Sequence, residues 1–161
     1  MENIIIPARK NDAVLLKNIA DVSFDKKYQK TLDIYESFFE EGCHCYFLMD
    51  GGLPVGELVL LPEESEVTIK SMAIVPAYRK KGYSRKLLEF AEDNAKTVKV
   101  AVNTTNKKAI DFYRKHGYNI VMHGAAGHTI NRVYTEQVLQ YLNYPICQSE
   151  QDVKQQLQQQ H

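Results

Sequence analysis

The chain has 161 residues, of which 44% are hydrophobic and 25% are charged, and its formal net charge is zero. This length favours a single domain with its own core, and the composition excludes a largely disordered or membrane-spanning chain. The balanced charge argues against a protein that binds nucleic acid through a broad basic face, so we expect neither nucleic acid nor a membrane as a partner.

The N-terminus and the cysteines indicate the compartment. Only a short apolar run precedes Pro7, too short for a secretory signal or a membrane anchor. Cys43, Cys45 and Cys147 form an odd set without C-x-x-C spacing, which favours a reducing compartment over a disulfide framework. A zinc site at residues 43–45 is disfavoured, because alternate residues of a strand point to opposite faces. The sequence predicts a cytoplasmic protein with no bound metal.

A strand and two helices are predicted at the start of the chain. Residues 4–6 form an apolar strand, and Asn11 or Asp12 can cap the helix that follows. The apolar positions of this helix recur near helical spacing at Val14, Leu15, Ile19 and Val22. A second helix is predicted over residues 25–41 and ends at Gly42. One side of it carries Tyr28, Leu32, Tyr35, Phe38 and Phe39.

Three strands come next. Residues 43–49 and 55–61 flank DGGLP, whose residues tolerate positive φ or fix a bend, so these two strands are predicted to form a hairpin. A longer strand is predicted over residues 66–75. One face of it carries Val67, Ile69, Ser71, Ala73 and Val75, and the other carries Glu66, Thr68, Lys70, Met72 and Ile74.

The second half of the chain alternates helices and strands. A helix is predicted to about residue 96, with Leu87, Leu88, Ala91 and Ala95 spaced to pack on a sheet. Residues 98–102 suit a short buried strand. Asn106 opens a helix that ends at Gly117. Strands over residues 118–122 and 128–134 follow.

This order of elements predicts a mixed α/β sheet. Residues 1–147 are predicted to form the domain. Residues 148–161 form a polar, glutamine-rich tail.

The stretch 74–88, IVPAYRKKGYSRKLL, places cationic side chains where a strand turns into a helix. A helix N-terminus has unpaired N–H groups and about half a positive charge, so it binds anions that the loop lets approach. Gly82 permits that approach, and Ser84 adds a donor. The cations that could bond phosphate oxygens are Arg79, Lys80, Lys81 and Arg85. The alternative is a solvated helix start.

The position of this cluster favours a phosphate site of the strand–turn–helix kind. It is not a Walker A loop, because G-x-x-x-x-G-K-[ST] is absent, and G-x-G-x-x-G is absent too. A ligand with several phosphates is expected.

At these residues the chain resembles a known family. MAIVPAYRKKGYSRKLL is similar to the acetyl-CoA-binding motif of the GNAT superfamily of N-acetyltransferases, in which a strand leads into [RQ]-x-x-G-x-[GA] and a helix. NTTNKKAIDFYRKHGY resembles that family's second motif, N-x-x-A-x-x-x-Y-x-x-x-G-[FY]. The positions that meet it are Asn106, Ala109, Tyr113, Gly117 and Tyr118. The resemblance spans about residues 3–135.

The resemblance implies a mostly antiparallel sheet with a splayed central strand pair, flanked by helices. It also implies an enzyme that transfers an acetyl group from acetyl-CoA, its co-substrate, to a primary amine by direct attack through a tetrahedral intermediate. Main-chain groups of Met72, Ala73 and Ile74 would pair with the pantetheine arm. The pyrophosphate would be wrapped by Lys80, Lys81, Gly82, Tyr83, Ser84 and Arg85.

Three residues of the second motif region are implied to reach the cofactor. Asn106 matches the family asparagine that contacts it, and Asn103 lies at the mouth of the gap between neighbouring strands. Tyr113 matches the tyrosine near the acetyl sulfur, where it can protonate the leaving thiolate as a general acid. The alternative for Tyr113 is a core tyrosine on the inner face of its helix.

The chain departs from the family pattern at two places. Ser84 stands where glycine or alanine is usual. The strand positions at which relatives carry a glutamate or histidine base are Thr68 and Lys70, neither of which suits a base. Glu57 is the favoured candidate base and Glu66 the other, each acting through water, and the alternative for both is an exposed strand carboxylate. An amine of low pKa would need no strong base.

A small-molecule amine is the expected acceptor. Residues 123–128 and a group of aromatic and acidic residues would suit a small cationic amine, unless the aromatic stripe is simply core. That group is Tyr28, Tyr35, Glu36, Phe38 and Glu40. Two alternatives stay open: an acyl-CoA-binding sensor without transfer, and an acetyltransferase for protein lysines or N-termini. A homodimer is also left open.

Overall fold

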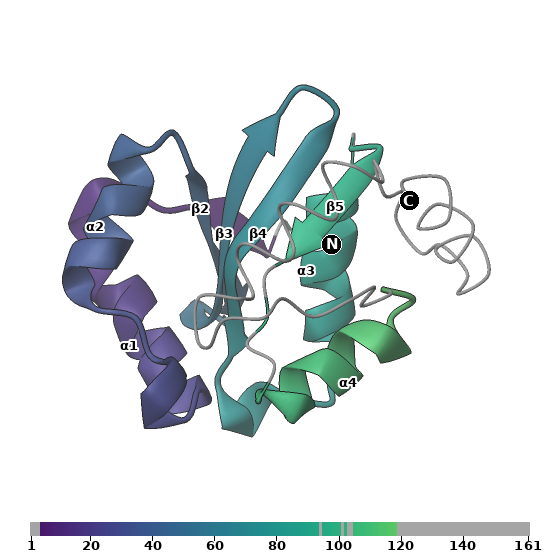
Figure 1. Ribbon diagram of the computed structural model, residues 1–161. Coiled ribbons are helices and arrows are strands. Elements are labelled where there is room, and N and C mark those ends of the chain that lie inside the picture. The colour runs from purple at the N-terminus through teal and green to yellow at the C-terminus, as the bar shows by residue number, and fades with distance from the viewer. Residues whose placement is uncertain (1–3, 94, 101, 103–104, 119–161) are drawn as a thin grey trace. The chain divides into compact units, whose positions relative to one another are not determined.

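The computed structural model describes residues 4–93, 95–100, 102 and 105–118 (Figure 1). Their contacts divide the chain into two compact units. The first holds residues up to 63 together with 69–93, and the second holds residues 64–68 with those from 94 onward. Cys147, residues 119–122 of the strand predicted over 118–122, the strand predicted over 128–134, and the tail at 148–161 fall outside the described residues.

The strands form one five-stranded sheet in the order β1-β2-β3-β4-β5. Their bounds are β1 Ile5–Pro7, β2 His44–Asp50, β3 Leu53–Glu63, β4 Glu66–Ile74 and β5 Thr97–Val100. Strand β2 pairs antiparallel with both β1 and β3. Strand β4 begins in the second unit and continues into the first. With helices on the sheet, this architecture confirms the predicted mixed α/β fold (Figure 1).

The predicted hairpin is confirmed between β2 and β3. Gly51 and Gly52, in the turn, have φ values of 58° and 83°, which favour glycine. The register shifts between Leu48 and Met49, so this pair carries a bulge. Beside the bulge, a Cβ on Gly56 would lie 2.9 Å from Ile74 Cδ1 and 3.1 Å from the Ala73 carbonyl oxygen. Glycine is therefore needed for β3 and β4 to approach this closely.

Helix α1, Ala13–Ser23, buries a different face from the predicted one. The buried residues are Ala13, Leu16, Ile19 and Ala20, whereas Val14, Leu15 and Val22 are exposed. Only Ile19 belongs to both sets. The sequence AVLLKNIADVS has apolar residues around much of the helix, so its pattern alone did not select the inner face.

Helix α2, Leu32–Glu40, begins later than predicted. A 3-10 turn at Lys26–Tyr28 comes first, and the chain then extends at Gln29. The amide of Gln29 donates to the carbonyl oxygens of Asp21 at 3.0 Å and Phe24 at 3.2 Å, which fixes this link. The Thr31 hydroxyl accepts from Ile34 N at 3.3 Å, so Thr31 caps the helix.

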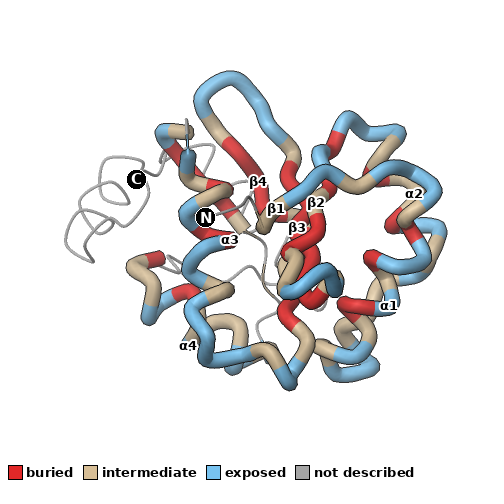
Figure 2. The backbone as a smooth tube through the Cα atoms, turned by 180° about the vertical axis from the view of Figure 1, so that it is seen from behind, coloured by how far each residue is buried: buried red, intermediate tan, exposed pale blue. Residues whose placement is uncertain are grey.

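The sheet of the first unit has helices on both faces (Figure 1). Helices α1 and α2 share a buried cluster with Cys45, Phe47, Val59 and Ala73 of the sheet. On the other face lies α3, Tyr83–Glu92, whose Phe90 ring packs edge-on against Tyr46 at 4.7 Å between centroids. Burial is accordingly concentrated in the central strands and the inward sides of the helices (Figure 2).

Helix α3 ends at Glu92 rather than near residue 96. Leu87, Leu88 and Ala91 are buried as predicted, and Ala95 lies beyond the helix. None of the helices in the described part of the chain is both long and apolar enough to cross a membrane.

The second unit contains the start of β4, strand β5 and helix α4, Lys107–Lys115. Lys96 N donates to the Ser65 carbonyl oxygen at 2.7 Å, and the ammonium of Lys99 lies 3.4 Å from the Glu66 carboxylate. These contacts join β5 to the beginning of β4. Helix α4 starts at Asn106 and is followed by Gly117 with φ of 90°, as the sequence predicts.

Candidate active site

Strand β4 leads into the basic loop and then into α3. A 3-10 turn at Pro76–Tyr78 follows the strand, and Gly82 occupies the N-cap position of α3. Two loop residues are left-handed, Lys80 with φ of 64° and Gly82 with φ of 81°. Lys80 adopts this region although it carries a Cβ, which costs energy that the surrounding loop must offset. Left-handed residues between ordinary ones turn successive N–H groups towards one side and create a concave anion site.

The start of α3 adds donors and charge to this loop. Lys86 N makes the first intrahelical bond, to the Gly82 carbonyl oxygen at 3.2 Å. The main-chain N–H groups that precede this ladder belong to Tyr83, Ser84 and Arg85. The exposed cations beside them are Lys80, Lys81 and Arg85. Such a position is suited to phosphate oxygens.

Arg79, which is predicted to bond phosphate, makes two hydrogen bonds to main-chain oxygens. Its Nε donates to the Ile74 carbonyl oxygen at 3.2 Å, and its Nη2 donates to the Ser23 carbonyl oxygen at 2.9 Å. The Ser23 hydroxyl also donates to the Ile74 carbonyl oxygen, at 3.1 Å. Arg79 and Ser23 therefore fasten the end of β4 and the loop to the C-terminus of α1.

Tyr83 ties the start of α3 to the β2–β3 hairpin. Its hydroxyl donates to the carboxylate of Asp50 at the end of β2. This hydrogen bond is the main cause of the raised pKa of Tyr83, which stays protonated and keeps donating. The loop between β4 and α3 is thus supported from two sides, by Tyr83 and by Arg79.

The main chain of β4 has one edge directed away from β3. Val75 N donates to the Val55 carbonyl oxygen at 2.9 Å, so Val75 faces β3. Alternate residues of a strand direct their N–H and C=O groups to opposite edges, so Met72 and Ile74 direct theirs away from β3. The Ile74 carbonyl oxygen already accepts from Ser23 and Arg79. Met72 is therefore the better placed of these two residues for pairing with an extended ligand.

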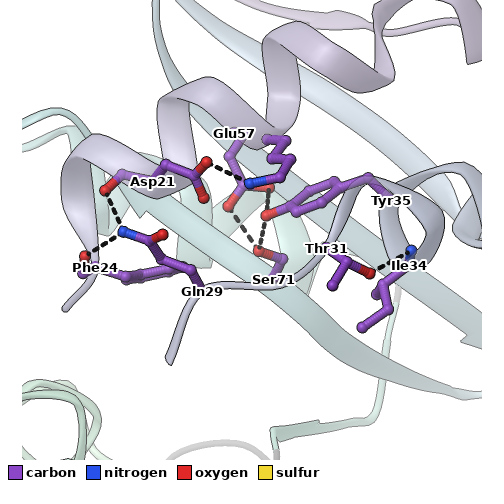
Figure 3. Close-up of polar contacts among 9 residues, drawn as sticks. Asp21, Phe24, Gln29, Thr31, Ile34, Tyr35, Glu57 and Ser71 are labelled. Atoms are coloured by element: carbon purple, nitrogen blue, oxygen red, sulfur yellow. Dashed lines mark hydrogen bonds and ion pairs between the residues drawn. The ribbon is translucent and has the colours of Figure 1, made fainter. Parts of the chain in front are cut away.

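Glu57 of β3 lies in a buried polar cluster between the sheet and α2 (Figure 3). Its side chain is 0% exposed, which rules out the alternative of an exposed strand carboxylate. The Ser71 hydroxyl donates to Glu57 Oε2 at 2.8 Å, and the Tyr35 hydroxyl lies 3.4 Å from Oε1. The hydroxyls of Tyr35 and Ser71 are themselves 2.9 Å apart. Three elements, α2, β3 and β4, thus bring these groups together.

Burial decides the protonation of this cluster. It raises the pKa of Glu57 to about 7, although the hydrogen bond from Ser71, the charge of Lys30 and the hydrogen bond from Tyr35 all oppose the rise. The pKa of Tyr35 is raised as well, chiefly by burial and then by the charge of Glu57, so Tyr35 keeps its proton. A carboxyl group with a pKa near neutrality can exchange a proton at physiological pH, as general base catalysis requires.

The other candidates for the base have different surroundings. Glu66 forms its ion pair with Lys99 in the second unit. Thr68 is buried, and Lys70 is partly buried. Thr68 and Lys70 carry no carboxyl group and Glu66 already has a cationic partner, so Glu57 has the chemistry best matched to a base.

The residues of the second motif lie in the second unit. The Asn106 side chain accepts from Ala109 N at 3.2 Å and caps α4. Tyr113 is buried among the rings of Phe112 and Tyr118, with centroids at 5.0 and 5.5 Å. Asn103 lies outside the described residues, as does the loop at residues 123–128.

The predicted acceptor patch of aromatic and acidic side chains does not form on α2. Tyr35 and Phe38 are buried and pack edge-on at 5.3 Å, so this stripe is core. Glu40 is exposed and lies 3.5 Å from Lys10. The argument for a cationic acceptor therefore loses its structural support.

Comparison with known proteins identifies the family. The family model described as an acetyltransferase (GNAT) domain matches residues 41–120, which include the hairpin, β4, the basic loop and α4. The chain belongs to the GNAT acetyltransferase family. No curated protein sequence matches the chain.

Solved structures share this GNAT fold. The ribosomal-protein-S18-alanine N-acetyltransferase from Escherichia coli is similar with a TM-score of 0.63 and 21% identity, over 73% of this chain and 78% of that one. An acetyltransferase from Thermus thermophilus gives 0.61 and 24%, over 75% and 89%. The PaiA N-acetyltransferase from Thermoplasma acidophilum, solved in complex with coenzyme A, gives 0.63 and 15%, over 79% and 95%.

Sequence analysis of this GNAT domain missed Tyr35 and Ser71 as partners of Glu57. The sequence placed Ser71 on the correct face of β4. A hydroxyl on the same face as the apolar residues Val67, Ile69 and Ala73 could have indicated a buried polar contact. Tyr35 gave no such signal, because a tyrosine in an apolar helix stripe fits the core equally well. The contact depends on how α2 lies over the sheet, which local periodicity does not specify.

Proposed function

We propose that this GNAT acetyltransferase uses acetyl-CoA to acetylate the primary amine of a small molecule. The observation that carries the proposal is the loop between β4 and α3, with left-handed Lys80 and Gly82 beside a helix N-terminus and exposed cations. This is the chemistry that a pyrophosphate needs. A similar structure that holds coenzyme A supports the same ligand.

The cofactor-binding groups follow from that loop. The main chain and cations of residues 80–85 bind the pyrophosphate, and Arg79 keeps the loop attached to α1. Main-chain groups at Met72, with Ala73 and Ile74 beside it, align the pantetheine arm. Bound acetyl-CoA supplies an activated acetyl thioester. Asn103, Asn106 and Tyr113 complete the proposed set from the second motif.

Two residues are proposed to move protons. Glu57 takes a proton from the attacking amine, and its pKa of about 7 means that both forms are populated near neutral pH. Tyr113 gives a proton to the departing thiolate. Its place in the family motif supports this role, and a phenolic hydroxyl is a donor from which a thiolate can accept.

The decisive experiment is acetyl transfer by the purified full chain. Acetyl-CoA is incubated with spermidine, L-lysine, kanamycin or an alanine-terminated peptide, and coenzyme A and acetylated amine are both quantified by mass spectrometry. Transfer to a small amine supports the proposal. Transfer to the peptide alone would make the enzyme a protein N-terminal acetyltransferase instead.

The same material distinguishes catalysis from sensing. Titration calorimetry with coenzyme A that shows saturable binding, together with no product from any amine, would contradict transfer and favour an acyl-CoA sensor. Tyr113→Phe is expected to lower kcat at least about tenfold while the affinity for coenzyme A changes little. An unaltered kcat across the pH range would remove Tyr113 from the mechanism.

A further inference from the structure

Ser71 of β4 donates to the buried carboxylate of Glu57 and directly precedes Met72, which is proposed to contact the cofactor. We infer that Ser71 relays a proton from the acceptor amine to Glu57, and that Tyr35 is a positioning residue that orients the Ser71 hydroxyl. This inference rests on the proposed function and identifies the route by which Glu57 acts.

The burial of Glu57 favours a relay over direct contact with the acceptor. Glu57 is 0% exposed, so a ligand has no direct access to its oxygens. Ser71 is also buried but is 5% exposed as a whole residue, and it donates to Glu57 Oε2 at 2.8 Å. It also directly precedes Met72, whose main chain points away from β3. Because a strand rises about 3.3 Å per residue, Ser71 lies within a few ångströms of the proposed cofactor contact along β4.

The hydrogen-bond capacity of Ser71 suits a relay. A serine hydroxyl has one proton to donate and two lone pairs that accept. When Glu57 is ionised, the Ser71 proton goes to Oε2, so the Tyr35 hydroxyl donates to Ser71 Oγ across 2.9 Å. Among the contacts of the described residues, this leaves one acceptor position on Ser71 Oγ. An N–H of the acceptor can occupy it.

Charged and titratable groups face the carboxylate from several elements. Lys30, in the link before α2, favours the ionised form of Glu57. Cys45 on β2 interacts with Glu57, and burial raises the pKa of this thiol to about 12, so Cys45 remains neutral. Asp21 on α1 acts on Tyr35 and helps to keep it protonated. Glu57 is therefore the group of this cluster that changes its protonation near neutral pH.

The proposed step conserves protons and needs no other reactant. As the amine nitrogen forms its bond to the acetyl carbon, its proton passes to Ser71 Oγ. The original Ser71 proton passes to Glu57 Oε2 at the same time. Ser71 ends as a hydroxyl and Glu57 as a neutral carboxylic acid, which later releases the proton to solvent. Tyr35 neither gains nor loses a proton.

A pair of variants at one position isolates the hydroxyl. Ser71→Thr and Ser71→Val add similar bulk to the same buried strand position, and they differ only in a hydroxyl against a methyl group. In the transfer assay, with spermidine, L-lysine and kanamycin as probe amines, we expect kcat of the threonine variant within about threefold of wild type. The valine variant should lose at least about tenfold in kcat with little change in the KM of acetyl-CoA. Equal kcat for the two variants would overturn the relay.

The positioning role of Tyr35 has its own readout. Tyr35→Phe removes the donor that orients the Ser71 hydroxyl towards ionised Glu57, so the acid limb of the kcat/KM profile should move to higher pH. Tyr46→Phe is the matched control, because Tyr46 packs on Phe90 at the opposite face of the sheet. An unmoved acid limb in Tyr35→Phe would overturn the positioning role.

A measurement without acetyl-CoA separates this inference from the proposed function. The carboxyl carbon-13 resonance of Glu57, assigned with Glu57→Gln, should titrate at higher pH in Ser71→Val than in Ser71→Thr. Identical titration midpoints in the two variants would show that the hydroxyl at position 71 does not stabilise ionised Glu57, and would overturn the inference. If wild type transfers acetyl groups to none of the probes while the midpoints differ, the proposed function and the relay both fail, although the Ser71 contact stands.

Discussion

The buried carboxyl group of Glu57 makes the stability of this protein depend on pH. Burial raises its pKa from 4.5 to about 7. The folded chain therefore binds this proton more tightly than the unfolded chain does. The stability that the proton contributes is fully present below about pH 4.5 and is lost as the pH rises through about 7.

Replacing Glu57 by glutamine should remove this dependence. We expect Glu57→Gln to raise the free energy of unfolding relative to wild type by about 3 kcal/mol at about pH 8.5, and by much less at about pH 5. Urea unfolding at both values measures the difference. Glu63→Gln, an exposed change on the same strand, should show no such pH dependence. A constant difference between Glu57→Gln and wild type across this range would contradict the raised pKa.

The sequence could predict the structural role of some individual residues but not of others. The caps Thr31 and Asn106, and the left-handed Gly82, follow from local chemistry, although Thr31 was recognised only in the structure. Glu57 was selected as a candidate base, but its burial depends on β2, β4 and α2 together. The contacts of Arg79 could not be predicted either, because only folding brings Ser23 and Ile74 within its reach.

Among the elements, the loop before α3 combines the proposed anion site with left-handed backbone at Lys80 and Gly82. Gly82 has φ of 81°, and a Cβ added to it would meet no atom within 4 Å, so a side chain there fits in space but not in conformation. Glycine adopts this conformation without strain, which the proposed grouping of N–H donors requires. The local geometry, rather than the side chains alone, should therefore determine coenzyme A affinity.

Gly82→Ala tests that dependence. We expect the affinity for coenzyme A to fall at least about tenfold, with a loss of about 1 kcal/mol in the free energy of unfolding. Calorimetric titration and urea unfolding measure the two effects. Gly42→Ala is the matched control, because Gly42 has φ of 85° and equally open surroundings but lies between α2 and β2. It should lose similar stability and keep its affinity. Equal loss of affinity in both variants would argue against a local site.

The strand pair β3–β4 is constrained by close approach at Gly56. An added Cβ would lie 2.9 Å from Ile74 Cδ1, 3.0 Å from Leu48 Cβ and 3.1 Å from the Ala73 carbonyl oxygen. The carbonyl belongs to the backbone, so the strands would have to separate. This constraint lies next to Glu57 and opposite the proposed cofactor segment.

Gly56→Ala is expected to destabilise the fold by about 1–3 kcal/mol through overpacking. Urea unfolding measures the loss. Gly42→Asn provides a control glycine without close neighbours, and asparagine tolerates positive φ, so its cost should be smaller. A Gly56→Ala protein as stable as wild type would show that β3 and β4 separate easily.

Element boundaries and faces illustrate what periodicity can and cannot specify. The hairpin and the start of α4 were predicted because glycine and asparagine have local conformational preferences. The prediction of the inner face of α1 was wrong, because Val14, Leu15 and Val22 are as apolar as the residues that the helix buries. The start of α2 was placed too early because the Gln29 contacts to Asp21 and Phe24 join segments that the pattern does not relate.

For the whole molecule, ligand binding should be visible as stabilisation. A ligand at about 100 times its dissociation constant stabilises the folded state by about 2.7 kcal/mol. For a chain of this size, that corresponds to a rise of about 5–10 °C in Tm. We expect coenzyme A to raise Tm by this amount in scanning calorimetry. Pantetheine, which lacks the pyrophosphate, should produce a much smaller rise, and an equal rise would place the binding energy outside the loop.

Strand β4 belongs to both compact units, since residues 64–68 cluster with one and 69–93 with the other. The proposed domain ends at residue 147 and therefore contains the whole of β4 and both motifs. A cut between the units would instead divide the strand that carries Ser71 and the proposed cofactor contacts.

Cys43 and Cys45 are buried, and the raised pKa of Cys45 keeps it from forming a thiolate. An aromatic disulfide dye added to the folded enzyme should consequently leave both sulfurs unlabelled. The yellow colour that develops during turnover, less the colour measured without acetyl-CoA, would then report coenzyme A. A sudden increase in dye uptake on warming would mark the melting of the side of the sheet that α1 and α2 cover.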